Sequence, residues 1–164
     1  MSARAEALKP AIAGEAGTPP IGEAVGMGAA IDYLSQIGIE AIEEHEQTLA
    51  ACTLERLGDV PGVEAFGPPA ERRAGIVSFD LEGIHPHDVA QILDWEGVAI
   101  RAGHHCCEPQ MARLGVAATN RASFYLHTIP EEIDRLVAGL HTVKETLGNG
   151  ASPTRGRREG GVRR

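Results

Sequence analysis

Hydrophobic residues recur at helical spacing in the first third of the chain, which predicts two long helices. These helices span residues 22–35 and 40–57, and Gly38 marks the break between them. In the second helix, four residues fall on one face and are expected to be buried: Ile42, Leu49, Thr53 and Leu57. We interpret the acidic residues of the same helix as its solvated face, and we assign no chemistry to His45.

The rest of the chain alternates short strands with helices. Residues 75–81 alternate hydrophobic and polar side chains with a period of two, which predicts a strand with one buried face. Further strands are expected at residues 63–66, 98–101 and 122–127, and further helices at 85–97, 109–114 and 128–147. Thr128 and Glu131 have the spacing of a capping box at the start of the last helix. This order predicts an α+β fold in which a short sheet packs against helices.

Length and charge predict one domain between two weakly structured ends. A chain of 164 residues is long enough for a core of its own. We expect residues 1–14 to be a frayed lead-in, residues 15–148 to form the domain, and residues 149–164 to be a disordered basic tail. Five arginines and one glutamate give the tail a charge of +4, so the remainder of the −8 chain carries −12. Because this body is acidic, we do not expect a nucleic-acid partner.

Hydropathy and cysteine content predict a cytoplasmic protein. No hydrophobic run approaches the roughly 18 residues of a membrane-spanning helix, so we expect no membrane partner. The first residues lack the apolar segment of a secretory signal. Three cysteines, an odd number, do not suggest a disulfide framework, and they fit a reducing compartment better.

Residues 101–109 read Arg-Ala-Gly-His-His-Cys-Cys-Glu-Pro and bring an arginine, two histidines and two cysteines together in one predicted loop. A thiol is nucleophilic as its thiolate, its unperturbed pKa is about 8.5, and neighbouring cations lower that value. Arg101, His104 and His105 can supply such a field to Cys106 or Cys107. The composition of this loop therefore predicts a reactive cysteine.

Two structural alternatives compete with a reactive cysteine. Imidazole and thiolate are the usual ligands of zinc, but four adjacent residues cannot readily surround one tetrahedral ion, so we expect no metal site. The other alternative is a small buried cysteine that fills space in a core. We prefer that interpretation for Cys52, which lies in a predicted helix. It is weaker for Cys106, because the neighbouring Gly, His and Arg residues indicate a loop.

The loop resembles the active-site segment of the group II cysteine desulfurases, whose pattern is Arg-x-Gly-His-His-Cys followed closely by Pro. Three other segments resemble the same family in the same order: Glu-Ala-Gly-Thr-Pro at 15–19, Gly-Ala-Ala-Ile-Asp-Tyr-Leu at 28–34 and Asn-Arg-Ala-Ser at 120–123. The likeness covers roughly residues 15–148. It implies the small C-terminal domain of a class V aminotransferase, one of the fold-type I pyridoxal-phosphate enzymes.

The resemblance also implies a reaction and a role for four residues. In the family, pyridoxal phosphate acts as electron sink on L-cysteine, and the products are alanine and a persulfide on an enzyme thiolate, which supplies iron–sulfur cluster assembly or other sulfur delivery. By position, Cys106 is the persulfide-forming cysteine and Arg121 clamps the substrate carboxylate through two parallel hydrogen bonds. Arg101 lines the same pocket. Thr18 corresponds to a threonine that reaches across the dimer to the phosphate of the partner subunit's cofactor; the alternative is a Thr-Pro turn with a solvated hydroxyl.

The chain departs from the family pattern in three places. Gly14 stands where an aromatic residue is usual, and Cys107 stands where a small residue without a thiol is usual. Cys107 can resolve a persulfide, form a strained vicinal disulfide or be a bystander, and we favour the bystander. A pyridoxal-phosphate enzyme also needs a lysine for its Schiff base. The chain has only Lys9, in the expected lead-in, and Lys144, in the last turns of a predicted helix, and neither is placed for that role.

We therefore expect the C-terminal part of a cysteine desulfurase, inactive without a cofactor domain. The expected partners are L-cysteine, a large domain that binds pyridoxal phosphate or a second copy of the chain, and a sulfur-acceptor protein. Two alternatives remain: a subunit that completes the active site of a separately encoded cofactor domain, and a non-catalytic carrier that accepts a persulfide on Cys106.

Overall fold

The computed structural model describes residues 17–148. The predicted lead-in and basic tail, like Lys9 and Gly14, lie outside the described residues. The chain divides into two units, Met1–Ile39 and Glu40–Arg164. In the first unit, helix α2 (Ile21–Ile37) ends at Gly38, whose φ of +100° favours glycine. None of its residues is buried, and it exposes six large apolar side chains: Ile21, Val25, Met27, Ile31, Tyr33 and Ile37.

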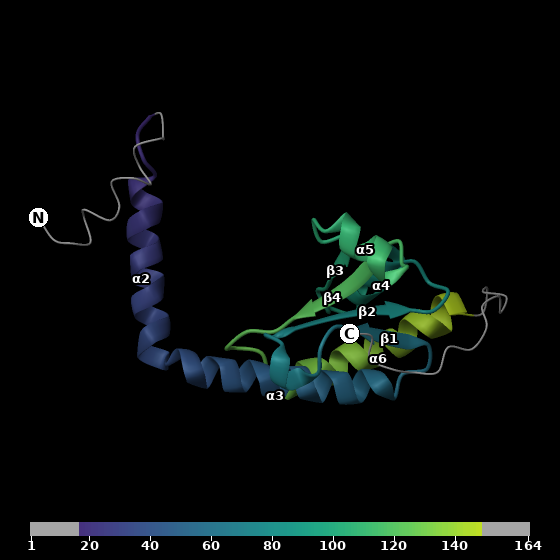
Figure 1. Cartoon of the computed structure of the whole chain (residues 1–164). Helices are drawn as coiled ribbons and strands as arrows, with labels where there is room; N and C mark the ends of the chain where they lie inside the picture. The colour runs from purple at the N-terminus through teal and green to yellow at the C-terminus, as the bar shows by residue number, and fades with distance from the viewer. Residues whose placement is uncertain (1–16, 149–164) are drawn as a thin grey trace, which may run out of the picture. The chain divides into compact units, whose positions relative to one another are not determined.

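The second unit is built on a four-stranded antiparallel sheet of order β1-β2-β4-β3 (Figure 1). The strands are β1 (Val63–Phe66), β2 (Ile76–Leu81), β3 (Arg101–Gly103) and β4 (Thr119–Ser123). The alternation predicted for the second strand is confirmed, since Val77, Phe79 and Leu81 are buried whereas Ser78 and Asp80 are half-buried. The sheet therefore has one face in the core and one partly open face.

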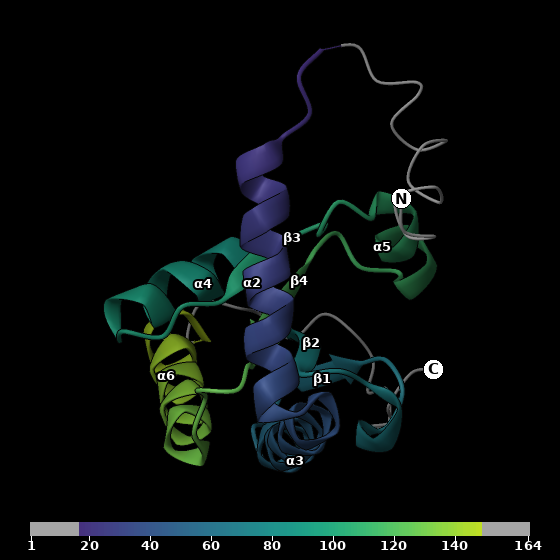
Figure 2. The same cartoon turned by 90° about the vertical axis from the view of Figure 1, so that its left-hand side faces the viewer.

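Three helices cover the buried face of the sheet and form the core with it. They are α3 (Ile39–Gly58), α4 (Pro86–Trp95) and α6 (Pro130–Leu147), and each contributes apolar side chains to one cluster with β2 and β4. Helix α5 (Glu108–Leu114) lies on the other side of the sheet from α4 and α6 (Figure 2). The predicted α+β fold, a short sheet packed against helices, is confirmed. No helix within residues 17–148 is long and apolar enough to cross a membrane.

Two predicted strands and one predicted cap are shifted in the structure. The strand expected at 98–101 occupies Arg101–Gly103, and the strand expected at 122–127 occupies Thr119–Ser123. The reason is that a strand extends only as far as its partner offers hydrogen bonds, and β3 pairs with β4 over three residues. The predicted capping box at Thr128 is wrong by one residue: the Glu132 carboxylate accepts from the backbone N–H of Ile129, and the Thr128 hydroxyl accepts from Tyr125.

The acidic face predicted for α3 is only partly solvated, because two of its side chains tie the helix to the sheet. Glu46 is half-buried and its carboxylate accepts a hydrogen bond of 3.1 Å from the backbone N–H of Gly75, at the start of β2. His45 Nε2 lies 3.0 Å from the carbonyl oxygen of Thr128. Both contacts are structural, and they fix α3 against one end of the β2–β4 pair, where Ile76 at the start of β2 pairs with Ser123 at the end of β4.

Candidate active site

The strand pairing brings four residues into one row across the open face of the sheet. Phe66 of β1 pairs with Ser78 of β2, Ser78 pairs with Arg121 of β4, and Arg121 pairs with Arg101 of β3. Residues that pair directly across antiparallel strands point to the same face. Arg101 and Arg121, the two arginines named from the sequence, are therefore neighbours on the open face of the sheet, where Ser78 also lies.

The segment after β3 forms a tight turn of unusual handedness. The backbone N–H of Cys107 donates a 2.9 Å hydrogen bond to the carbonyl of His104, which closes the turn. Its two central residues, His105 and Cys106, have φ values of +54° and +58°. Positive φ at both central positions is the signature of a type I′ turn, which ordinarily selects Asn-Gly. A non-glycine residue in the left-handed region is strained, so this turn holds Cys106 at some cost in stability.

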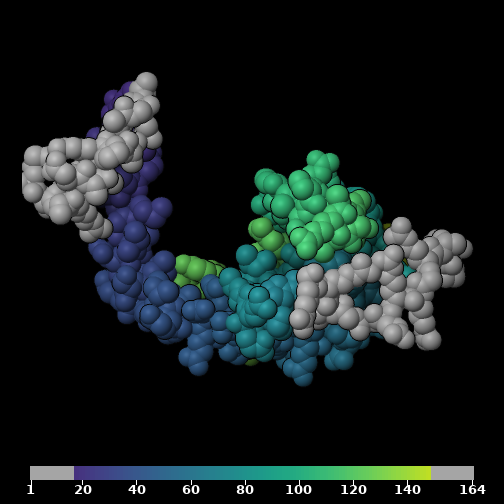
Figure 3. All heavy atoms as spheres, viewed as in Figure 1, coloured from purple at the N-terminus to yellow at the C-terminus, as the bar shows by residue number. Residues whose placement is uncertain are grey.

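Cys106 lies at the tip of this turn, in contact with Arg101. Arg101 Nη2 lies 3.9 Å from Cys106 Sγ, and both residues are exposed. The segment that contains the turn and α5 projects at the surface, as the green atoms of Figure 3 show. A thiolate or persulfide at Cys106 would therefore be accessible to other molecules and would have a guanidinium as its counter-charge.

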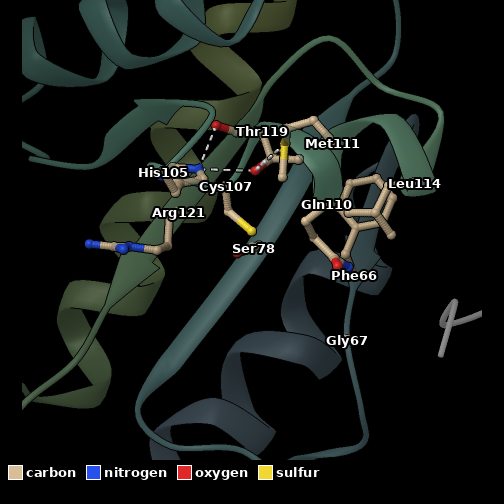
Figure 4. Close-up of a pocket in the computed structure, with 10 residues that line it drawn as sticks. All are labelled: Phe66, Gly67, Ser78, His105, Cys107, Gln110, Met111, Leu114, Thr119 and Arg121. Carbon is tan, nitrogen blue, oxygen red and sulfur yellow. Dashed lines mark hydrogen bonds between the residues drawn. The ribbon is translucent and has the colours of Figure 1, made fainter.

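A cavity of about 250 Å³ lies between α5 and the open face of the sheet (Figure 4). Cys107 lines this cavity, whereas Cys106 does not. The other lining residues are Phe66, Gly67, Ser78, His105, Gln110, Met111, Leu114, Thr119 and Arg121. Both adjacent thiols are exposed, and Cys107 in addition borders the cavity.

One wall of the cavity is held in place by Arg73. This half-buried guanidinium donates hydrogen bonds to the carbonyls of Phe66, Pro68 and Ile76, and so it pins the loop between β1 and β2. Burial lowers the pKa of Arg73 from its usual value. A Cβ at Gly67, where φ is +108°, would lie 3.2 Å from Arg73 Nη2, so glycine there leaves room for the guanidinium.

His105 is hydrogen-bonded through one ring nitrogen, and its other ring nitrogen has no partner among the described residues. Its Nε2 lies 3.1 Å from the carbonyl oxygen and 3.0 Å from the hydroxyl of Thr119. Because a carbonyl can only accept, Nε2 carries a proton, and in the neutral form of the ring Nδ1 is the unprotonated nitrogen. Nδ1 is buried and has no hydrogen-bond partner among the described residues. Burial lowers the pKa of His105, and the charges of Arg121, Arg101 and His104 act in the same direction, while the bond to Thr119 opposes them.

The described residues do not by themselves make a pyridoxal-phosphate site. Their one lysine, Lys144, lies on α6, which covers the opposite face of the sheet from the cavity, and its Nζ donates a 2.6 Å hydrogen bond to the carbonyl of Pro61. Thr18 is exposed and precedes α2 in the first unit. Within residues 17–148, no group of three His, Cys, Asp or Glu side chains could hold a metal ion. The contact of Thr18 with a cofactor phosphate therefore stays a prediction.

The structure brings together three of the four residues named from the sequence, Cys106, Arg101 and Arg121, and it adds residues that sequence reasoning missed. Thr119 orients His105 through hydrogen bonds to its ring, and the Thr119 hydroxyl donates to Sδ of Met111 at 3.9 Å. No local pattern marks these two residues, because they acquire their roles only through strand pairing and the packing of α5. Cys52, predicted to be a buried core residue, is only half-buried in α3 and is not part of the core cluster.

The matching family model and the similar curated proteins point to the same family. Residues 6–136 match the family described as Aminotransferase class-V. A probable cysteine desulfurase from Halalkalibacterium halodurans is 52% identical over 135 residues, which is 82% of this chain and 33% of that protein. One from Streptomyces coelicolor is 53% identical over 135 residues, 82% of this chain and 32% of that protein. The chain thus spans about a third of the length of these curated relatives.

Two solved structures share the fold. The cysteine desulfurase CsdA (S-sulfonic acid) from Escherichia coli superimposes with a TM-score of 0.76 at 33% identity, covering 81% of this chain and 33% of that chain. The apo cysteine desulfurase from Thermococcus onnurineus NA1 gives a TM-score of 0.76 at 42% identity, with the same coverage. Again, the similarity extends over about a third of each structure.

Proposed function

This chain belongs to the class V aminotransferase family, and we propose that it is the C-terminal part of a cysteine desulfurase. In this proposal L-cysteine is converted to L-alanine, and its sulfur is taken up as a persulfide on Cys106. The persulfide then supplies iron–sulfur cluster assembly or another sulfur-requiring reaction. Residues of the second unit carry the sulfur and bind the substrate, whereas the cofactor is bound elsewhere.

The observation that carries the proposal is the arrangement of Cys106 with the two arginines. The turn presents Cys106 at the surface, and Arg101 contacts its sulfur at 3.9 Å. Arg121, the cross-strand neighbour of Arg101, lines the adjacent cavity. A planar guanidinium binds a carboxylate through two parallel hydrogen bonds, so Arg121 is suited to hold the carboxylate of L-cysteine. Arg121 Nε is buried and unpaired among the described residues, which leaves that group available to a ligand.

Pyridoxal phosphate, which the family implies, would supply the electron sink for this reaction when bound. The described residues contain no lysine near the cavity, so we derive no catalytic step through the cofactor from this chain. We expect the chain alone to be inactive toward L-cysteine for want of that lysine. We still predict that Thr18 contacts the phosphate of a partner subunit's cofactor.

The proposal is tested by complementation. The purified chain would be mixed with pyridoxal phosphate, L-cysteine and the part of the Halalkalibacterium halodurans relative that this chain does not match. We expect alanine to form only in the mixture, and the sulfur to be recovered on Cys106. The Cys106→Ser variant should lose the persulfide, and Arg121→Lys should raise the KM for L-cysteine because a lysine cannot bind a carboxylate in the bidentate mode.

Arg113→Lys is the matched control, since Arg113 is an exposed arginine on α5 outside the cavity lining. This variant should leave the KM for L-cysteine unchanged. Alanine formed by the purified chain without the added domain would contradict the expected dependence on a separate cofactor domain. Full persulfide formation in Cys106→Ser would remove Cys106 from the proposed reaction.

One observation favours the alternative of a non-catalytic sulfur carrier. Cys106 is exposed and already has a guanidinium counter-charge without any cofactor domain. A carrier should accept sulfur from a persulfide donor and should form no alanine in any mixture. If iodoacetamide alkylated Cys106 no faster than the half-buried Cys52, the carrier function would be excluded.

The proposed partners follow from the exposed surfaces and thiols. Helix α2 exposes six large apolar side chains, and such a surface ordinarily marks an interface. We propose that a large cofactor-binding domain or a second copy of the chain covers it, and that a sulfur-acceptor protein meets Cys106. The three free cysteines fit a reducing compartment, and the cytoplasm remains our prediction.

A further inference from the structure

The left-handed turn that carries Cys106 is not favoured by its own sequence. Its two central residues, His105 and Cys106, both have positive φ, and neither is glycine. A turn of this kind ordinarily selects Asn-Gly, because other side chains are strained in the left-handed region. Strained backbone persists where surrounding contacts hold it in place. The contacts that hold this turn therefore also determine where the Cys106 sulfur lies.

The side chain of His105 ties the turn to β4. His105 follows Gly103, the last residue of β3, by two positions, and its half-buried ring reaches Thr119, the first residue of β4. Nε2 lies 3.1 Å from the carbonyl oxygen and 3.0 Å from the hydroxyl of Thr119 (Figure 4). The Thr119 hydroxyl donates its proton to Met111 Sδ, so it accepts from Nε2. One N–H is thus shared between two acceptors of a fully buried residue.

The register of β3 and β4 fixes this anchor relative to Arg101. Gly103 pairs with Thr119 and Arg101 pairs with Arg121, so the anchor and the guanidinium belong to the same strand pair, two positions apart. Cys106 directly follows the anchored His105, and its Sγ lies 3.9 Å from Nη2 of Arg101. Release of the His105 ring would free the strained backbone to leave the left-handed region. The Cys106 sulfur would then move away from the guanidinium.

We propose that His105 is a positioning residue: the contact of its ring with Thr119 holds the turn in its left-handed form and thereby keeps Cys106 beside Arg101. The ring acts through the backbone, and this role requires no contact of His105 with the Cys106 sulfur or with a substrate. Where it concerns sulfur uptake, the inference rests on the proposed function. A displaced nucleophile reacts slowly however well its substrate is bound, so the position of Cys106 should govern that step.

The test measures the positive charge beside Cys106 and needs no cofactor. In the purified full chain with the substitutions Cys52→Ser and Cys107→Ser, Cys106 is the remaining thiol of the sequence. Its alkylation rate is measured with iodoacetate, an anion, and with iodoacetamide, the neutral analogue. Both reagents react with the thiolate, so the ratio of the two rates is independent of the thiolate fraction and reports the nearby charge. At about pH 8 the histidines are largely neutral and contribute little to that charge.

The ratio of the iodoacetate rate to the iodoacetamide rate should follow the contact with Arg101. Unit charges about 4 Å apart in water attract each other enough to change this ratio about fivefold, so Arg101→Met should lower it by about that factor. His105→Leu and His105→Ala, which lack the N–H donor, should lower it nearly as much, and Arg101→Met should then have no further effect. His105→Gln should keep the wild-type ratio, because its amide can still donate to Thr119.

The matched control is His141→Leu, a change at an exposed histidine of α6, which should leave the ratio unchanged. Urea denaturation establishes that each variant is folded under the conditions of the assay. An unchanged ratio in folded His105→Leu and His105→Ala would overturn the proposal. It would also be overturned if Arg101→Met still lowered the ratio fully in those two variants, or if His105→Gln lowered it as much as they do.

The complementation mixture tests the consequence for sulfur uptake. His105→Leu should slow persulfide formation on Cys106 by about tenfold or more and leave the KM for L-cysteine unchanged, whereas His105→Gln should keep the wild-type rate. A raised KM with an unchanged maximal rate would assign His105 to substrate binding and contradict the inference. If the wild-type chain forms no persulfide in the mixture, the proposed function fails, whereas the ratio of alkylation rates still decides whether His105 positions Cys106.

Discussion

The left-handed turn at Cys106 predicts that glycine is the most stable replacement for this residue, the reverse of the order expected within a helix. Cys106 is exposed, so its replacement changes little packing, and its φ of +58° dominates the comparison. A non-glycine residue in this region costs about 1–2 kcal/mol. Glycine avoids that cost, although it loses about 0.4–1 kcal/mol through the greater entropy of the unfolded chain. Cys106→Gly should therefore be up to about 1.5 kcal/mol more stable than Cys106→Ala.

Valine should be the least stable replacement, because a β-branched residue at positive φ is a genuine outlier. The assay is urea denaturation of the glycine, alanine and valine variants, with the free energy of unfolding obtained by linear extrapolation. The glycine variant should also lose persulfide formation. Higher stability together with lost persulfide formation would show that the strained backbone of the turn serves to position Cys106.

Cys52 provides the matched control within the same chain. It lies in the middle of α3, where φ is helical, and glycine should there be about 1 kcal/mol less stable than alanine. The reasoning predicts opposite signs of the glycine–alanine difference at positions 52 and 106. Glycine that destabilises both positions equally would show that Cys106 is not held in the left-handed region, and the argument from strain would be refuted.

Three further predictions concern the core and the pH dependence of stability. Gly139→Ala should lower the free energy of unfolding by about 1 kcal/mol despite the better helix propensity of alanine, because its Cβ would clash with Cδ2 of the fully buried Leu93. Urea denaturation measures this change, and Leu93→Ala should relieve the added cost in a double-mutant cycle. Asn120→Val should raise the free energy of unfolding by about 1 kcal/mol, because both polar side-chain atoms of Asn120 are buried and have no hydrogen-bond partner among the described residues. A loss of stability in this variant would show that the Asn120 amide has a hydrogen-bond partner. The lowered pKa of His105 means that, as the pH falls below about 6.5, the unfolded chain binds a proton before the folded chain does, so wild type should lose stability there. The His105→Gln variant should lose less, whereas His141→Gln, a change at an exposed histidine, should behave as wild type. Chemical denaturation at about pH 7 and about pH 5.5 measures these differences.

Several features of the fold could be predicted from local sequence. Of the four residues predicted to be buried on α3, Leu49, Thr53 and Leu57 are buried and Ile42 is half-buried, and Gly38 separates the first two helices as expected. The period of two at 75–81 correctly identified β2. These predictions succeeded because helix and strand periodicity are local properties, and because Gly and Pro restrict the backbone wherever they stand.

Predictions that depended on a partner strand or on a neighbouring hydrogen bond were less accurate. The limits of β3 and β4 are set by their mutual pairing, and the last helix starts at Pro130 because Thr128 is engaged by Tyr125. The buried amide of Asn120 was not anticipated either, since a strand pattern of such short length does not reveal which face is covered.

By itself, the sequence determined the content of the candidate site, because the residues of the loop at 101–109 are adjacent along the chain and their chemical types are fixed. Only the tertiary structure decided their geometry. Strand pairing made Arg101 and Arg121 neighbours, and the left-handed turn directed Cys106 toward Arg101 while Cys107 borders the cavity. Contact between Thr119 and His105 fixed which ring nitrogen of His105 carries the proton in its neutral form. The physical reason is that pairing register, turn handedness and cavity shape arise from contacts between distant segments, which no local pattern encodes.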